Sequence, residues 1–360
     1  MSLSIGIVGL PNVGKSTLFN ALTNAEALAA NYPFATIEPN TGIVPVPDPR
    51  LATLQGIYGS EKVLPATVTF VDIAGLVAGA STGEGLGNQF LHNIRECDAI
   101  VHVVRAFHND DILRHDDAPI DPQSDIEIIN TELILADIQT IDRHLPKLQK
   151  EAKSDPAKRT EYDQLITIRD ALNEGKTVSS LSLSVSQSLS LSLLTAKPTI
   201  YAFNVDEAGL SDSNLQSQMK SLVAPHDVVF VCAKLEEELR GLDEPDAKEL
   251  LASYGVTESG LHQLARAAYH TLGLQSYLTA GPKEVRAWTI HQGDTAPQAA
   301  GVIHTDFEKG FIAAQIVSFP DLVEAGSELA AKQAGRVHTV GRDYVMQPDD
   351  IVEFRFNVKK

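Results

Sequence analysis

Short apolar runs alternate with helix-length or glycine-rich segments through much of this chain. The runs are rich in β-branched residues, which favour strands, and the segments between them are long enough for crossover connections. Such runs lie at residues 5–8, 68–71, 99–104, 199–203 and 228–231. This alternation predicts an α/β fold with a doubly wound, mainly parallel sheet that helices cover on both faces.

A helical pattern interrupts the strands between about residues 126 and 195. Isoleucine and leucine recur three and four positions apart from Ile126 to Leu148, which predicts a long amphipathic helix with Pro146 as the place for a kink. A second helix is expected to end at Gly175, so the two form an inserted α-helical hairpin. Serine and leucine then alternate over residues 179–193, and this period of two suits a strand but would spread leucines around a helix, so no conformation is assigned.

The chain changes character again from about residue 278. Strand-like runs at residues 286–290, 311–317 and 351–356 predict a small mixed α/β module. We therefore expect a separate C-terminal domain, residues 278–360. The preceding residues, 1–277, would then form the sheet domain that the hairpin interrupts.

Composition adds a strong acidic excess to an otherwise ordinary globular protein. The chain has 360 residues, of which 43% are hydrophobic, and a formal net charge of -18, which argues against a surface that coats nucleic acid. The local exception is the predicted hairpin tip, residues 143–159, where six basic and two acidic side chains give +4. A local RNA contact and a solvated helix face are equally good interpretations of this tip.

Neither secretion nor a membrane anchor is indicated. The N-terminus leads directly into a strand, and no apolar run approaches the ~18 residues of a membrane span. Two cysteines, Cys97 and Cys232, lie far apart in no metal-ligand spacing. We expect a cytoplasmic protein whose cysteines are small buried hydrophobes.

The sequence GLPNVGKST at residues 9–17 is the strongest chemical signal. It completes the pattern G-x-x-x-x-G-K-[ST] between a predicted strand and a predicted helix, as a phosphate loop requires. The glycines let backbone N–H groups turn towards phosphate, while Lys15 reaches the β- and γ-phosphate oxygens and Ser16 is placed to bind magnesium. The loop therefore predicts binding of a nucleoside triphosphate. The loop residues expected to contact it are Asn12, Val13, Gly14, Lys15, Ser16 and Thr17.

Two further segments extend the predicted magnesium site. Asp72 ends a buried strand three residues before Gly75, and in P-loop switches such an acid holds magnesium while the glycine amide senses the γ-phosphate. Thr36 lies in the loop after the first helix, where a second magnesium-binding hydroxyl is expected; an ordinary turn threonine is the alternative. The predicted catalytic residues are Lys15, Thr36 and Gly75, and the predicted magnesium ligands are Ser16, Thr36 and Asp72.

These motifs together resemble those of the YchF family of Obg-related P-loop NTPases, of the TRAFAC class. The resemblance covers nearly the whole chain and is carried by residues 9–17, 31–34, 72–76, 83–91 and 283–289. It implies a nucleotide-binding domain with a coiled-coil-like helical insertion, and a C-terminal β-grasp domain of the ubiquitin-like TGS type. It also implies a preference for ATP and, as partner, the ribosome, with the 50S subunit and the 70S particle contacted through RNA and protein. We expect a monomer.

Hydrolysis is expected to be slow without a partner. Ras-type switches orient the attacking water with a glutamine after the D-x-x-G glycine, but this chain has Leu76 there, and an aliphatic side chain cannot hydrogen-bond water. Asn12 resembles the P-loop asparagine that binds potassium in some related switches, where the cation supplies positive charge. A turn-capping asparagine is an equal alternative.

The predicted base pocket departs from the guanine-specific pattern N-K-x-D. Residues 204–207 read N-V-D-E, so the lysine is absent, and Glu207 replaces the aspartate that accepts from guanine N1–H and the 2-amino group. This favours ATP over GTP, with residues 231–234 as the loop that backs the base. The residues predicted to form this side of the site are Asn204, Val205, Glu207 and Ala233.

The leading functional hypothesis is an ATP-hydrolysing molecular switch that binds the ribosome. A nucleotide-gated binding protein with negligible hydrolysis is an alternative that Leu76 favours. An Obg-type GTPase is a second alternative. A small-molecule phosphotransferase is disfavoured, because the sequence shows no arginine-rich lid and such an enzyme has no use for the D-x-x-G switch.

Overall fold

The computed structural model describes residues 3–23, 40–73, 86–107, 120–181 and 191–357, and the chain divides into two compact units. The first unit comprises residues 1–44 and 69–268, and the second comprises residues 45–68 and 269–360. This division differs from the boundary expected between residues 277 and 278. Residues 45–68 leave the sheet domain between two of its strands and fold with the C-terminal part of the chain.

The first unit is built on a six-stranded sheet in the order β2-β4-β1-β5-β6-β7. Its strands from β4 to β7 run parallel, which confirms the predicted doubly wound, mainly parallel sheet. The central strand β5 is buried along its whole length, which explains why it is apolar at every position except His102 and Arg105. The strands are β1 (Ser4–Val8), β2 (Thr41–Pro45), β4 (Thr67–Asp72), β5 (Ala99–Arg105), β6 (Thr199–Asn204) and β7 (Asp227–Val231).

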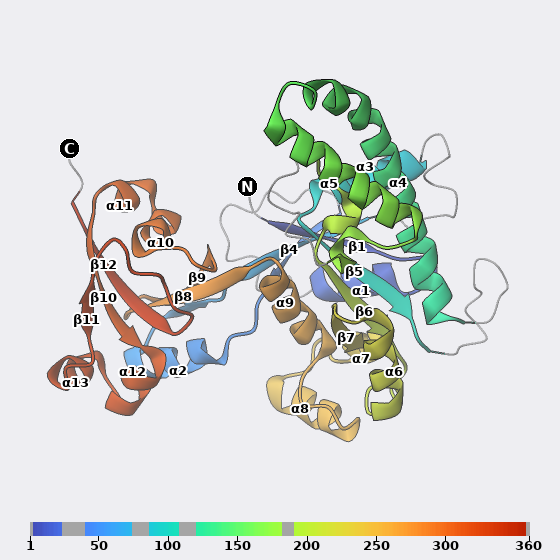
Figure 1. Ribbon diagram of the computed structural model, residues 1–360. Helices are drawn as coiled ribbons and strands as arrows, with labels where there is room; N and C mark the ends of the chain where they lie inside the picture. The colour runs from blue at the N-terminus through green and yellow to red at the C-terminus, as the bar shows by residue number, and fades with distance from the viewer. Residues whose placement is uncertain (1–2, 24–39, 74–85, 108–119, 182–190, 358–360) are drawn as a thin grey trace. The chain divides into compact units, whose positions relative to one another are not determined.

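Helices connect these strands and cover the sheet (Figure 1). Both cysteines, Cys97 and Cys232, are buried and unbridged, as expected. In the part of the chain that the structure describes, no helix combines the length and the apolar character needed to cross a membrane. The helices between strands are α1 (Lys15–Thr23), α3 (Leu86–Glu96) and α6 (Ser213–Val223), and those that follow β7 are α7 (Ala233–Glu238), α8 (Glu244–Ser253) and α9 (Gly260–Thr271).

Two long helices, α4 (Pro122–Glu151) and α5 (Pro156–Asn173), form the predicted hairpin between β5 and β6 (Figure 1). Each helix begins at an aspartate whose carboxylate accepts a backbone N–H of the first turn, followed by a proline at the first helical position. The first helix continues through Pro146, and the second ends just before Gly175, which is left-handed with φ of 80°. The facing sides bury isoleucine and leucine, as the sequence pattern predicted.

A buried carboxylate on α4 anchors the chain where it returns to the sheet. Asp137 Oδ1 accepts the backbone N–H of Leu194 at 2.8 Å, and Oδ2 accepts both the N–H and the hydroxyl of Thr195 at 2.8 Å. These residues form the 3₁₀ turn η4 (Leu194–Ala196), which follows another such turn, η2 (Val178–Ser180). Most of the Ser/Leu alternation, residues 182–190, lies outside the described residues.

The second unit is a mixed sheet in the order β11-β10-β12-β8-β9-β3, packed with short helices. The inserted residues 45–68 supply β3, which pairs in parallel with β9, and α2, whose Arg50 bonds the Asp349 carboxylate at 3.0 Å. These long-range contacts explain why the segment belongs to this unit. Its elements are α2 (Pro49–Tyr58), β3 (Lys62–Leu64), β8 (Leu274–Ala280), β9 (Glu284–His291), α10 (Ala296–Ile303), α11 (Thr305–Lys309), β10 (Phe311–Ser318), α12 (Phe319–Ala325), α13 (Glu328–Gln333), β11 (His338–Val340) and β12 (Asp350–Phe356).

Candidate nucleotide-binding site

The predicted phosphate loop joins the carboxyl end of β1 to the first turn of α1. Its backbone is left-handed at Asn12, with φ of 62°, and has φ of 99° at Gly14. A side chain at Gly14 would also run into the amide group of Asn204, so only glycine fits there. The first helical bond runs from Leu18 N–H to the Gly14 carbonyl at 2.9 Å. The loop thus ends at a helix N-terminus, the usual backbone setting for an anion site.

Lys15 is buried beneath this loop and lies near the predicted magnesium-binding acid. Its ammonium group donates to the Leu10 carbonyl at 2.7 Å. Burial lowers the pKa of Lys15 to about 8, and the negative charge of Asp72 opposes that shift. Burial likewise raises the pKa of Asp72, while Lys15 acts in the opposite direction. Lys15 and Asp72 influence each other's pKa because β4 pairs with β1. This pairing sets Asp72 opposite Ile7, close to the start of the phosphate loop.

Two hydroxyls begin the same helix. Ser16 and Thr17 occupy the first turn of α1, and both side chains are exposed. An exposed hydroxyl and a half-buried carboxylate at neighbouring strand ends are oxygen ligands of the kind that magnesium prefers. The other predicted residues of this region, Thr36 and Gly75, lie outside the described residues, as does Leu76.

Asn204 connects the phosphate loop to the predicted base pocket. It is the last residue of β6 and is buried. Its Nδ2 donates to the Val13 carbonyl at 3.0 Å, and its Oδ1 accepts the N–H of Ala233 at 3.2 Å. The next residue, Val205, donates its N–H to the Val231 carbonyl at 2.9 Å. One side chain therefore holds three loops together at the carboxyl edge of the sheet, where ligands bind in doubly wound folds.

Glu207 forms an ion pair that the pattern of residues 204–207 does not predict. Its Oε1 lies 2.7 Å from Nζ of Lys234, in the first turn of α7, which follows β7. The hydrogen bond from Lys234 lowers the pKa of Glu207, and the same bond raises the pKa of Lys234. The sequence places both residues in the predicted base pocket, but spacing alone does not show that two loops bring them into contact.

A small pocket on the phosphate loop brings in two charged residues that sequence analysis missed, Arg105 and Asp125. Arg105 ends β5, where its guanidinium stacks 4.6 Å from the centre of the Phe107 ring and its Nε donates to the Phe107 carbonyl at 3.3 Å. The available signal was a charged residue at the end of an apolar strand. The pocket is lined by Leu10, Pro11, Asn12, Val13, Arg105, Ile120 and Asp125.

Two family models match the chain. One, MMR_HSR1, described as "50S ribosome-binding GTPase", matches residues 4–137. The other, YchF-GTPase_C, described as "Protein of unknown function (DUF933)", matches residues 274–357. The first match contains the phosphate loop and Asp72, and the second covers most of the C-terminal part of the second unit.

Similarity to known proteins extends over the full length. The chain is 51% identical to the "Ribosome-binding ATPase YchF" of Haemophilus influenzae, over 99% of this chain and all of that protein. It is 47% identical to the protein of the same name from Bacillus subtilis, with the same coverage. Among solved structures, that of the Schizosaccharomyces pombe YchF GTPase superposes with a TM-score of 0.87 at 38% identity, covering 98% of both chains.

Proposed function

The chain belongs to the YchF family of P-loop NTPases, and we propose that it is an ATPase that binds the ribosome and acts as a nucleotide-dependent switch. The observation that carries this proposal is the arrangement around Asn204, which ties the phosphate loop to both base loops while Lys15 lies near Asp72. The full-length relatives supply the partner, since their names state ribosome binding. We further propose that the protein works in the cytoplasm, where the ribosome is, and that it is a monomer.

The roles of individual residues follow from where they lie. The Lys15 ammonium would leave the Leu10 carbonyl for the β- and γ-phosphate oxygens, which are stronger acceptors because they are charged. Ser16 and Asp72 would hold magnesium. For Thr36 and Gly75, which lie outside the described residues, the sequence motifs alone support roles as a further magnesium ligand and as the amide that senses the γ-phosphate. The ion, when bound, neutralises phosphate charge. Asn12 would hold potassium if it acts as the P-loop asparagine of related switches does, while its left-handed backbone, with φ of 62°, suits a turn-capping asparagine equally well.

Hydrolysis depends on what replaces the missing glutamine. Leu76 cannot orient water, so we propose a low intrinsic rate that the ribosome raises by supplying or ordering the missing group. Leu76 also supports a second candidate, a binding protein that is gated by ATP and hydrolyses it negligibly. Glu207 in place of aspartate supports ATP rather than GTP as the nucleotide in both cases.

Single-turnover phosphate release from bound ATP tests this proposal. We expect slow release from the free protein and release at least about tenfold faster with ribosomes, whether 70S particles or 50S subunits. GTP at equal concentration should give less bound nucleotide and less phosphate. Release that ribosomes leave unchanged and negligible would support the gated binding protein, and faster turnover of GTP would support an Obg-type GTPase.

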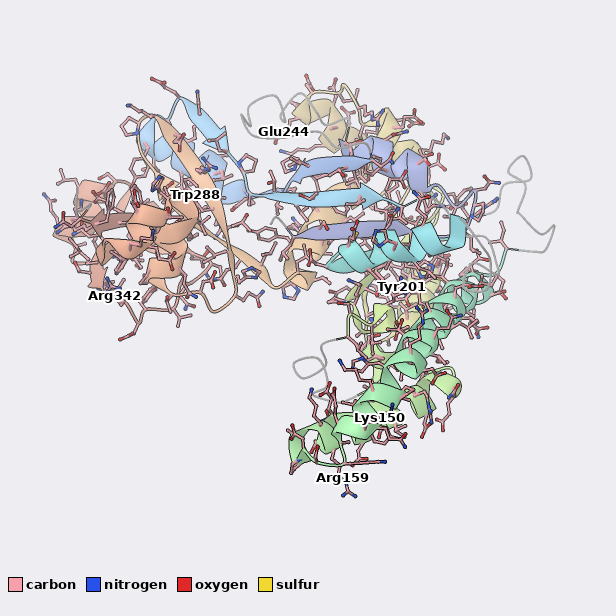
Figure 2. The ribbon with its side chains drawn as sticks, turned by 90° about the horizontal axis from the view of Figure 1, so that it is seen from above. Lys150, Arg159, Tyr201, Glu244, Trp288 and Arg342 are labelled. Carbon is pink, nitrogen blue, oxygen red and sulfur yellow. The ribbon has the colours of Figure 1, made fainter. Side chains whose placement is uncertain are left out.

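The basic hairpin tip is the proposed site of the contact with ribosomal RNA. Figure 2 shows Lys150 and Arg159 near the end where α4 passes into α5. Both are exposed, as is Lys153 between them. Clustered exposed cations gain affinity for RNA by releasing counterions from phosphates, and this effect is local enough to survive in an acidic protein.

Replacing Lys150, Lys153 and Arg159 with glutamine should lower the affinity for ribosomes by about tenfold or more and reduce its salt dependence. Nucleotide-dependent sedimentation with ribosomes at several salt concentrations measures both effects. The matched control carries the same loss of charge elsewhere, at exposed Lys176, Lys220 and Lys248. Equal sedimentation of the tip variant and the control would remove the tip from the contact surface.

A further inference from the structure

The ion pair between Glu207 and Lys234 lies where the two predicted base loops meet. Glu207 follows β6 and Lys234 follows β7, and these strands are neighbours. The pair is placed by the adjacent bond from Ala233 N–H to Asn204 Oδ1, which holds the start of α7 against the end of β6. The Glu207 side chain is 30% exposed and the Lys234 side chain 71% exposed, so both remain accessible to a bound base.

The ion pair with Lys234 changes the set of hydrogen-bond donors and acceptors, the edge, that Glu207 presents to a nucleotide base. A free carboxylate is a pure acceptor, and its two oxygens match the two donors of guanine, N1–H and the 2-amino group. When an ammonium binds one of those oxygens, the remaining edge consists of one acceptor and one N–H donor. Adenine presents the complement of that edge, because its 6-amino group donates and its N1 accepts.

We propose that Lys234 is a specificity-determining residue, which converts Glu207 from a guanine-type acceptor edge into an acceptor and donor edge that fits adenine. This inference rests on the proposed function, in which ATP is the nucleotide. Both partners are charged at neutral pH, since each stabilises the charged form of the other. The ion pair also explains how a carboxylate can stand at the fourth position of residues 204–207 without selecting guanine.

The test is the ratio of the dissociation constants for GTP and ATP, measured by isothermal titration with magnesium. The wild type is expected to prefer ATP, and Lys234→Ala should lower that preference by about tenfold, since the loss of one hydrogen bond from a charged donor corresponds to about this factor. Lys234→Arg keeps a donor beside the carboxylate and should retain most of the preference. Lys248→Ala breaks an exposed ion pair with Glu244 on α8 and should leave the ratio unchanged.

A second substitution tests the edge itself. In Lys234→Ala, the further change Glu207→Gln restores one acceptor and one donor within a single amide, so the double variant should regain the preference for ATP. A ratio that Lys234→Ala leaves at the wild-type value would overturn the inference while leaving the proposed ATPase intact. Failure of the double variant to regain ATP preference would also overturn it. A wild type without ATP preference would contradict both the inference and the proposed nucleotide.

Discussion

Lys15→Ala is expected to reduce ATP hydrolysis by at least a few hundredfold while leaving the protein folded. Removing one positioned charge from a transition state costs roughly 10²–10³ in rate, and Lys15 is the buried cation of the phosphate loop. Affinity for ATP should also fall, because the same ammonium would contact the β- and γ-phosphates before and during transfer. Single-turnover phosphate release with and without ribosomes measures the first effect, and titration with ATP measures the second.

The direction of the Lys15 pKa shift predicts how Lys15→Ala changes stability, so a loss of activity can be distinguished from a loss of folding. The pKa of Lys15 is lowered to about 8 in the folded protein, so burial of the charged form costs stability below that pH, and the cost fades as the pH rises through about 8 towards the unfolded value. Alanine removes this cost, so the thermal midpoint at neutral pH should stay level or rise. Lys176→Ala, at an exposed ion pair with Glu174, is the control for loss of a lysine. Hydrolysis by Lys15→Ala within about twofold of wild type would show that the loop does not hold the reacting phosphates.

The sheet and the hairpin were predictable because local patterns determine them. β5 is apolar at nearly every position since both faces are covered, and α4 repeats its apolar side chains at helical spacing because one side faces α5. The unit boundary was not predictable in this way. Residues 45–68 join the second unit through β3 pairing with β9 and through Arg50 bonding Asp349, contacts that span more than two hundred residues and leave no local signal.

The candidate site likewise has parts that the local sequence predicts and parts that only the tertiary structure reveals. The phosphate loop and Asp72 follow from spacing, because glycines and a strand end impose the backbone that the chemistry uses. The bridging role of Asn204 and its contact with Ala233 required the two loops to be placed in space. The ion pair of Glu207 and Lys234 also required the structure, since it joins the turn after β6 to the first turn of α7.

Asp137→Ala is expected to detach the η4 turn from the helical hairpin and to lower the local stability there by about 3 kcal/mol. The substitution leaves two buried backbone N–H groups, of Leu194 and Thr195, without their acceptor, and each such group costs roughly 1–3 kcal/mol. Burial raises the pKa of Asp137, so part of this loss is offset by removing a poorly solvated carboxylate. Asp137→Asn should be intermediate, because its amide oxygen can still accept from Leu194 while its NH₂ group faces the donors of Thr195.

Hydrogen exchange of the peptides covering α4, α5 and residues 191–199 measures this loss as a local opening rather than a global one, which suits a chain of two units. The expected opening constant rises by about a hundredfold, since 1.4 kcal/mol corresponds to tenfold. Asp142→Ala is the matched control on the same helix, because that carboxylate is 55% exposed and lies 3.8 Å from Arg169, a weak surface pair. Equal exchange in the two variants would mean that packing of the apolar hairpin side chains, and not the Asp137 anchor, holds the chain that returns to β6.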